Sequence, residues 1–198
     1  MAATKSPVFL PLVPTIATLL VLAAAASSFA AGESQTSFAT KKQPMTMKKA
    51  KLTHLHFYWS NIRSGPEATA QIVAPILNNA TFYGTVALND DTLTLGPNPD
   101  NSTSVGKARG LYHFPSNTTA LVYEMVYNFA FTYGDYNGSS ISLLGSVFPT
   151  SGTANELSVA GGTGVFRFAR GYAVLNFFSF DPIRTLVVNE LDVYVSHY

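Results

Sequence analysis

Asp90 and Asp91 are adjacent carboxylates that follow a run of strand-forming residues. Two carboxylates held close together separate each other's pKa values, so that one of them can act as an acid at neutral pH. Because Asn89 precedes them, the same residues also suit a turn. We therefore take Asp90 and Asp91 as candidate catalytic residues at a strand end, with a turn as the open alternative.

His54 and His56 are spaced i, i+2, so in a strand their side chains lie on one face. Zinc sites need three or four converging ligands, and no acidic residue is adjacent to this pair in the sequence. The chain contains no cysteine, which excludes disulfides, thiol catalysis and cysteine metal sites. The sequence therefore predicts surface histidines, no metal site and no bound cofactor.

The four residues from Gly161 to Gly164 read GGTG and let the backbone turn sharply. A phosphate-binding glycine loop would be followed directly by a helix, whereas Val165 begins an aromatic and basic run without a capping residue. We predict a tight bend followed by a strand from Val165 to Ala169, in which Phe166 and Phe168 share one face.

Four N-x-S/T sequences are candidate glycosylation sites, at Asn79, Asn101, Asn117 and Asn137. Asn101 lies in a loop rich in Gly, Pro and Asn. Asn137-Gly138 is also typical of a two-residue hairpin turn, in which the asparagine adopts a positive φ.

Residues 1–30 have the pattern of a secretory signal peptide. Lys5 gives a positive start, the segment 15–26 is apolar, and Ser28-Phe29-Ala30 is a small-x-small cleavage site. The uninterrupted apolar run is shorter than the roughly 20 residues that span a bilayer. We expect cleavage after Ala30, secretion to the extracellular space and no membrane span.

Residues 31–51 are polar and lysine-rich, and they predict a flexible basic arm. From residue 52 onward six basic residues stand against ten acidic ones, and the basic residues are scattered along the sequence. A surface that binds nucleic acid would need them clustered, so no nucleic-acid partner is predicted. Residues 52–198 are long enough for one domain with its own core.

Residues 119–132 give the cleanest two-residue alternation in the chain. Odd-numbered residues from Leu121 to Phe131 are all apolar and predict a buried face. The opposite face is only partly polar, with Val122 and Val126, and indicates a second contact with a neighbouring subunit. Further strands are expected at residues 52–59, 82–88, 110–114, 140–148, 165–169, 172–180 and 184–196. About eight strands without a helix of useful length fit a sandwich or a closed barrel.

Several of these segments together resemble the plant dirigent family. The resemblance rests on GGTGVFRFARGYA at residues 161–173, QIVAP at 71–75, DDTLT at 90–94, VGKARGLY at 105–112, YNGS at 136–139 and the ending VYVSHY at 193–198. The resemblance implies an all-β domain over residues 52–198, an eight-stranded antiparallel β-barrel like that of allene oxide cyclases. It also implies association into a trimer and a ligand pocket in the barrel.

The resemblance further implies which residues line the pocket. Tyr112 matches a pocket tyrosine of lignan-forming members, and Phe114 and Phe148 are expected beside it. Three positions depart from those members: Asn61 and Phe148 stand where they carry aspartates, and Asn155 stands where they carry an arginine. The acid that protonates a quinone methide is thus missing unless Asp90 or Asp91 supplies it.

These observations favour a secreted dirigent protein that binds phenoxy radicals or quinone methides and directs monolignol coupling. Such a protein needs no redox centre of its own, because an external laccase or peroxidase supplies the radicals, and whether it is an enzyme in its own right stays open. One alternative is a cyclase or isomerase of a terpenoid or flavonoid intermediate, and another is a cell-wall scaffold for oxidases.

Overall fold

The computed structural model describes residues 49–118, 121–149 and 152–198. The predicted signal peptide and nearly all of the predicted basic arm lie outside the described residues. Within them the chain is all-β, with two short 3₁₀ helices. None of the helices described is long and apolar enough to cross a membrane.

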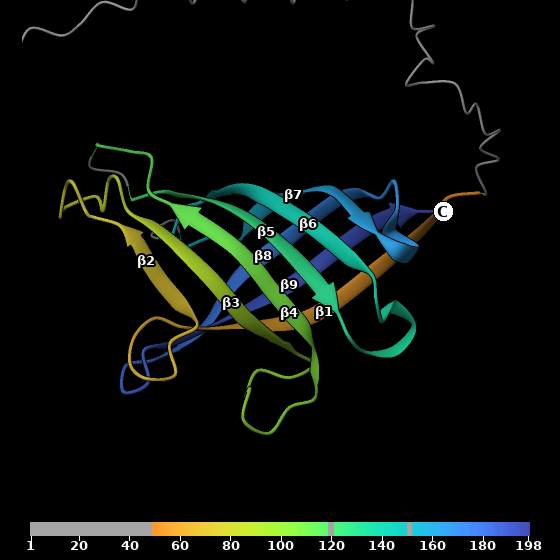
Figure 1. Cartoon of the computed structure of the whole chain (residues 1–198). Coiled ribbons are helices and arrows are strands. Elements are labelled where there is room, and N and C mark those ends of the chain that lie inside the picture. The colour runs from red at the N-terminus through yellow and green to blue at the C-terminus, as the bar shows by residue number, and fades with distance from the viewer. Residues whose placement is uncertain (1–48, 119–120, 150–151) are drawn as a thin grey trace, which may run out of the picture. The chain divides into compact units, whose positions relative to one another are not determined.

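Nine strands follow one another along the chain (Figure 1). They are β1 (Lys51–Ile62), β2 (Ala70–Ala74), β3 (Val86–Thr94), β4 (Ser104–His113), β5 (Tyr123–Phe131), β6 (Ser140–Val147), β7 (Asn155–Thr163), β8 (Arg170–Asp181) and β9 (Leu186–His197). The 3₁₀ helices η1 (Gly134–Tyr136) and η2 (Gly164–Phe166) follow β5 and β7.

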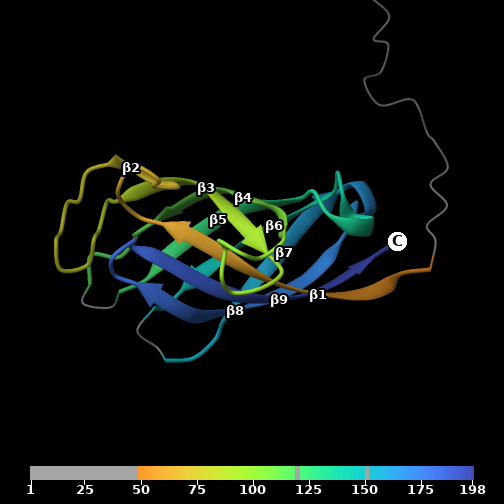
Figure 2. The same ribbon diagram turned by 90° about the horizontal axis from the view of Figure 1, so that it is seen from below.

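Eight of these strands close into an antiparallel barrel. Neighbours in the sequence pair from β3 to β9, and β9 then pairs with β1 along its whole length, from Lys51 opposite His197 to Ile62 opposite Leu186. Figure 2 shows β9 between β1 and β8. The barrel closes where β1 pairs with one end of β3, through Trp59 opposite Leu93, while β2 covers the other end of β3. The predicted eight-stranded barrel is confirmed.

The barrel interior is filled by the inward-facing residues of each strand. In β5 the expected alternation is confirmed, because Met125, Tyr127 and Phe129 are buried while Val126 on the opposite face is exposed. Three aromatic rings pack together where β5, η1 and η2 meet. The ring centroids of Phe131, Tyr136 and Phe166 are 5.1 to 6.4 Å apart, and the rings are partly or fully buried. These rings close one end of the barrel, so any internal space lies toward the other end.

The segment after the GGTG residues is not the predicted strand. Gly161 to Thr163 are the last residues of β7, and Gly164, with φ +61°, starts the 3₁₀ helix η2. Phe166 is fully buried, whereas Phe168 is half exposed with φ +62°, so the two rings do not share a face. The sequence alternation was misleading because a 3₁₀ turn places consecutive side chains about 120° apart.

Two further predictions need correction, and two strands were missed. Asp90 and Asp91 lie in the middle of β3, paired with Arg109 and Ala108 of β4, and not in a turn or at a strand end. Asn137 has φ −53°, and it is Gly138 that takes the positive φ. The strands β2 and β7 were not predicted at all.

Candidate functional site

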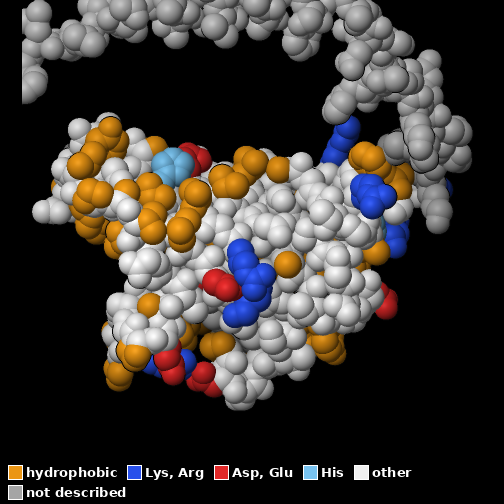
Figure 3. All heavy atoms as spheres, in the orientation of Figure 1, with side chains coloured by type: hydrophobic (Ala, Val, Ile, Leu, Met, Phe, Trp, Pro, Cys, Tyr) orange, Lys and Arg blue, Asp and Glu red, His pale blue; other side chains and the backbone are white. Residues whose placement is uncertain are grey.

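A cavity of about 570 Å³ opens at the end of the barrel opposite the aromatic closure. Its walls come from the C-terminal parts of β1, β4 and β6, the middle of β8, the N-terminal parts of β2, β3, β5, β7 and β9, and the loops between them. This volume is within the range of pockets that hold one drug-sized ligand. Apolar side chains gather on the surface at the end of the barrel where β2 lies (Figure 3), among them Ile72, Ile76 and Phe82.

Aromatic rings make up much of the cavity wall. The Tyr112 ring lies 5.9 Å from Phe114 and 5.5 Å from Tyr123, and the Trp59 ring meets Tyr127 edge to face at 4.8 Å. Burial raises the pKa of Tyr123 to about 12 and also raises the pKa values of Tyr112 and Tyr127. These phenols therefore stay protonated and can donate hydrogen bonds.

Asp91 lies just behind this wall and is fully buried. Its carboxylate accepts hydrogen bonds from four side chains: Trp59 Nε1 at 2.7 Å, Asn61 Nδ2 at 2.9 Å, Asn89 Nδ2 at 3.2 Å, and the Thr69 hydroxyl. Burial raises the pKa of Asp91 to about 6, although the four donors act in the opposite direction. Its donors Trp59, Asn61 and Asn89 line the cavity, so Asp91 fixes the orientation of three wall residues.

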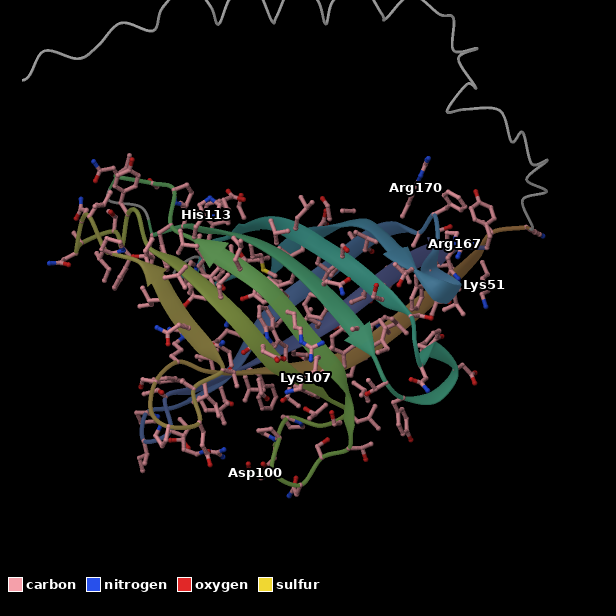
Figure 4. The ribbon with its side chains drawn as sticks, viewed as in Figure 1. Lys51, Asp100, Lys107, His113, Arg167 and Arg170 are labelled. Atoms are coloured by element: carbon pink, nitrogen blue, oxygen red, sulfur yellow. The ribbon has the colours of Figure 1, made fainter. Side chains whose placement is uncertain are left out.

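Asp90 points away from the cavity. Its side chain is 59% exposed and accepts a hydrogen bond from Arg109 Nε at 3.1 Å, and Lys107 lies beside it. Figure 4 labels Lys107 near the middle of the visible outer face. Figure 3 has the same orientation and shows acidic and basic side chains next to one another there. Of the two adjacent carboxylates, only Asp91 is in a position to influence a bound ligand.

A family model described as Dirigent-like protein matches residues 52–196 of the chain. The chain belongs to the dirigent family. It is 42% identical over 154 residues to pterocarpan synthase 1 of Glycine max, covering 76% of this chain and 82% of that protein. It is 38% identical over 187 residues to dirigent protein 7 of Arabidopsis thaliana, covering 94% of this chain and 98% of that protein. A solved pterocarpan synthase dirigent protein superposes with a TM-score of 0.69 at 39% identity, covering 78% of this chain and 89% of the other.

The pocket residues expected from the dirigent resemblance all line the cavity. Tyr112 and Phe114 lie at the end of β4, and Phe148 follows β6 at the rim, where it is half exposed. Asn155 at the start of β7 also lines the cavity, and its Oδ1 accepts a hydrogen bond from the backbone N–H of Phe148 at 2.8 Å. The two departures at positions 148 and 155 are thus neighbours in the structure.

Several wall residues were not singled out from the sequence. Trp59, Asn89 and Tyr127 face the barrel interior, where the two-residue period of β1, β3 and β5 places them. That period could have identified the inward face of each strand. It could not show which inward residues surround an open cavity, because this depends on how far the side chains of eight strands fill the barrel.

No group of three or more His, Cys, Asp or Glu residues in the described parts of the chain could hold a metal ion. His54 and His56 are surface residues, as predicted, but they have acidic neighbours on β9 that the sequence did not reveal. His54 Nε2 lies 2.7 Å and His56 Nδ1 3.0 Å from the same oxygen of Asp192. Burial is the largest single influence on the pKa of Asp192 and raises it. The hydrogen bonds from His54 and His56, together with the charges of the two rings, outweigh burial, so the pKa of Asp192 is lowered overall.

Proposed function

We propose that this dirigent protein binds a phenolic quinone methide, or the radicals that form one, and sets the stereochemistry of the bond that follows. The observation that carries this proposal is the aromatic cavity of about 570 Å³, closed at its inner end and lined by protonated tyrosines around a buried carboxylate. Such a wall holds a planar ligand in one orientation and donates hydrogen bonds to its oxygen atoms.

The reaction favoured here is ring closure within one ligand molecule. Loss of a benzylic hydroxyl and a phenolic proton as water gives a quinone methide. A second phenolic oxygen then adds to it, and the proton that this oxygen loses restores the first phenol. The sequence balances without an oxidant. It is supported by the cavity volume, which suits one drug-sized ligand, and by the 42% identity to a protein named pterocarpan synthase 1.

The second candidate is monolignol coupling, in which two single-ring radicals from an external laccase or peroxidase meet in the cavity. The aromatic wall would also suit two such rings. The acid pair that the dirigent resemblance associates with lignan formation is absent, because Asn61 and Phe148 occupy its positions. Ring closure after coupling would therefore proceed without control of its stereochemistry.

The coupling candidate is tested with coniferyl alcohol and a one-electron oxidant. We expect little or no enantiomeric excess in the pinoresinol formed, and no consumption of coniferyl alcohol when the oxidant is left out. Combining Asn61→Asp, Phe148→Asp and Asn155→Arg should raise the excess. Strong stereoselectivity of the unmodified protein would show that coupling is its reaction, and turnover without oxidant would require a redox centre.

The place of action and the assembly are also proposals. We expect a secreted homotrimer in the apoplast, glycosylated at Asn79 and Asn101, whose side chains are exposed as those of Asn117 and Asn137 are. Contact between subunits is supported by an apolar row across the outside of four paired strands, Leu88, Leu111, Val126 and Leu144. Three of these side chains are between 42% and 54% exposed in the single chain.

A further inference from the structure

Arg63 is the one charged side chain among the described residues that line the cavity. It follows β1 directly and is exposed. Arg109 and Arg184 form ion pairs away from the cavity, whereas the Arg63 side chain has no hydrogen bond or ion pair with any described residue. A guanidinium keeps its positive charge and offers five N–H donors. The cavity wall therefore carries a cation that is available to a ligand.

The backbone holds Arg63 at the mouth of the cavity. Trp59 and Asn61 line the cavity from the inner face of β1, and the two-residue period continues this row to Arg63 directly after the strand ends. The Arg63 N–H donates to Thr185 O at 3.1 Å, and the next N–H, of Ser64, donates to Thr185 Oγ1 at 3.0 Å. The long side chain thus starts from a fixed point on the wall.

Two phenols lie within the range of this charge. Tyr112 and Tyr123 line the cavity, and their ring centroids are 5.5 Å apart. Burial raises the pKa values of both, to about 12 for Tyr123, whereas the Arg63 charge acts in the opposite direction on both. Because the two phenols stay protonated, they can donate hydrogen bonds near the cation. A guanidinium and two phenolic donors suit a ligand oxygen that carries negative charge.

We infer that Arg63, with Tyr112 and Tyr123, binds the phenolate oxygen of the ligand ring that becomes the quinone methide. The inference rests on the proposed function and adds the orientation of the ligand. The ring that becomes the quinone methide lies toward the mouth, and the ring that supplies the second oxygen lies deeper in the barrel. The substrate class is thereby narrowed to ligands with a free hydroxyl on the outer ring.

Negative charge is present on this oxygen twice during the proposed ring closure. The ionised phenol supplies the electron pair that expels the benzylic hydroxide, which leaves as water with the proton that the phenol has lost. The oxygen of the resulting quinone methide is neutral. When the second phenolic oxygen adds, an electron pair returns to the first oxygen, which then takes up the proton that the second oxygen loses. A guanidinium beside the first oxygen stabilises both charged states.

The test follows the ionisation of a bound phenol by its absorbance. The probe is 7-hydroxyisoflavone, a planar phenol that has no group to eliminate and whose phenolate absorbs at longer wavelength than the phenol. With the full mature chain in excess, the bound hydroxyl should ionise about tenfold more readily than in Arg63→Gln, which corresponds to a pKa about one unit lower. Arg63→Lys keeps the charge and should retain most of this difference. Arg109→Gln is the matched control, because Arg109 is paired with Asp90 outside the cavity.

The methyl ether of the probe separates charge from shape. It cannot ionise, so the unmodified chain and Arg63→Gln should bind it with equal affinity. A weaker affinity of Arg63→Gln for the ether would show that Arg63 shapes the cavity, and it would overturn the inference. Ionisation of the bound phenol at the same pH in both proteins would also overturn the inference, while the proposed function would stand. Failure of both compounds to bind would contradict the proposed function as well.

Discussion

Among the residues that the structure describes, Asp91 is the one buried carboxylate, and its ionisation depends on burial more than on its four hydrogen bonds. Its pKa of about 6 lies above the value of 3.8 for an aspartate in water. Between these two values the folded chain binds more protons at Asp91 than the unfolded chain does. Asp91 therefore makes the folded state less stable as the pH rises from about 4 to about 6.

Asp91→Asn should remove this pH dependence. The shift in pKa corresponds to about 3 kcal/mol, so the free energy of unfolding of the unmodified chain should fall by up to that amount between pH 4 and pH 7, relative to the variant. Urea unfolding of both proteins at several pH values measures it. The difference between the two curves isolates Asp91, since all other groups titrate in both. Parallel curves would show that the pKa of Asp91 is the same in the folded and the unfolded chain.

At the scale of strands, β5 shows what a sequence can predict. Its two faces differ clearly in polarity, and the predicted buried residues from Met125 to Phe131 are all inside the barrel. β7 was missed because Gly161 and Gly162 interrupt its pattern, and β2 because it is short and mostly exposed.

Asp91 was misplaced for a similar reason. A charged pair preceded by asparagine suits a turn locally. Two of the donors that make the burial of Asp91 possible, Trp59 and Asn61, come from β1, which is distant in the sequence and pairs with β3 only in the fold.

The outer face of β5 carries a prediction about assembly. Val126 is 54% exposed in the single chain and lies in the apolar row, whereas Asn128 on the same face lies in the polar row beside it. Val126→Glu should leave the barrel folded but lower the mass in solution, because a charge without a partner is costly in an apolar interface. Light scattering with circular dichroism measures both effects. Asn128→Glu should have a smaller effect on mass, and a monomeric unmodified chain at micromolar concentration would contradict the proposal.

The whole molecule has two different ends. His113 lies toward the cavity end, whereas Lys51, Arg167 and Arg170 lie at the closed end (Figure 4). The separation follows from the antiparallel order of the strands, which brings the end of β4 near the start of β5 and the start of β1 near the end of β9. The cavity therefore lies at the end of the barrel opposite these three basic residues.

The proposed secretion and glycosylation also concern the molecule as a whole. Protein isolated from plant cell walls should begin near Ala31 and lose mass when its N-linked glycans are removed. Mass spectrometry before and after enzymatic deglycosylation measures the change and locates the glycans. Unmodified side chains at both Asn79 and Asn101 would contradict this expectation.

The central claim is that the cavity controls the stereochemistry of ring closure, and chiral analysis of the product tests it most directly. The substrate is a racemic isoflavan-4-ol with free hydroxyls at C7 and C2′, which can lose water through a quinone methide and close to a pterocarpan without an oxidant. With the protein present, we predict faster closure than in buffer and an enantiomeric excess in the pterocarpan formed early in the reaction. Formation of racemic pterocarpan at the rate seen in buffer would contradict the claim.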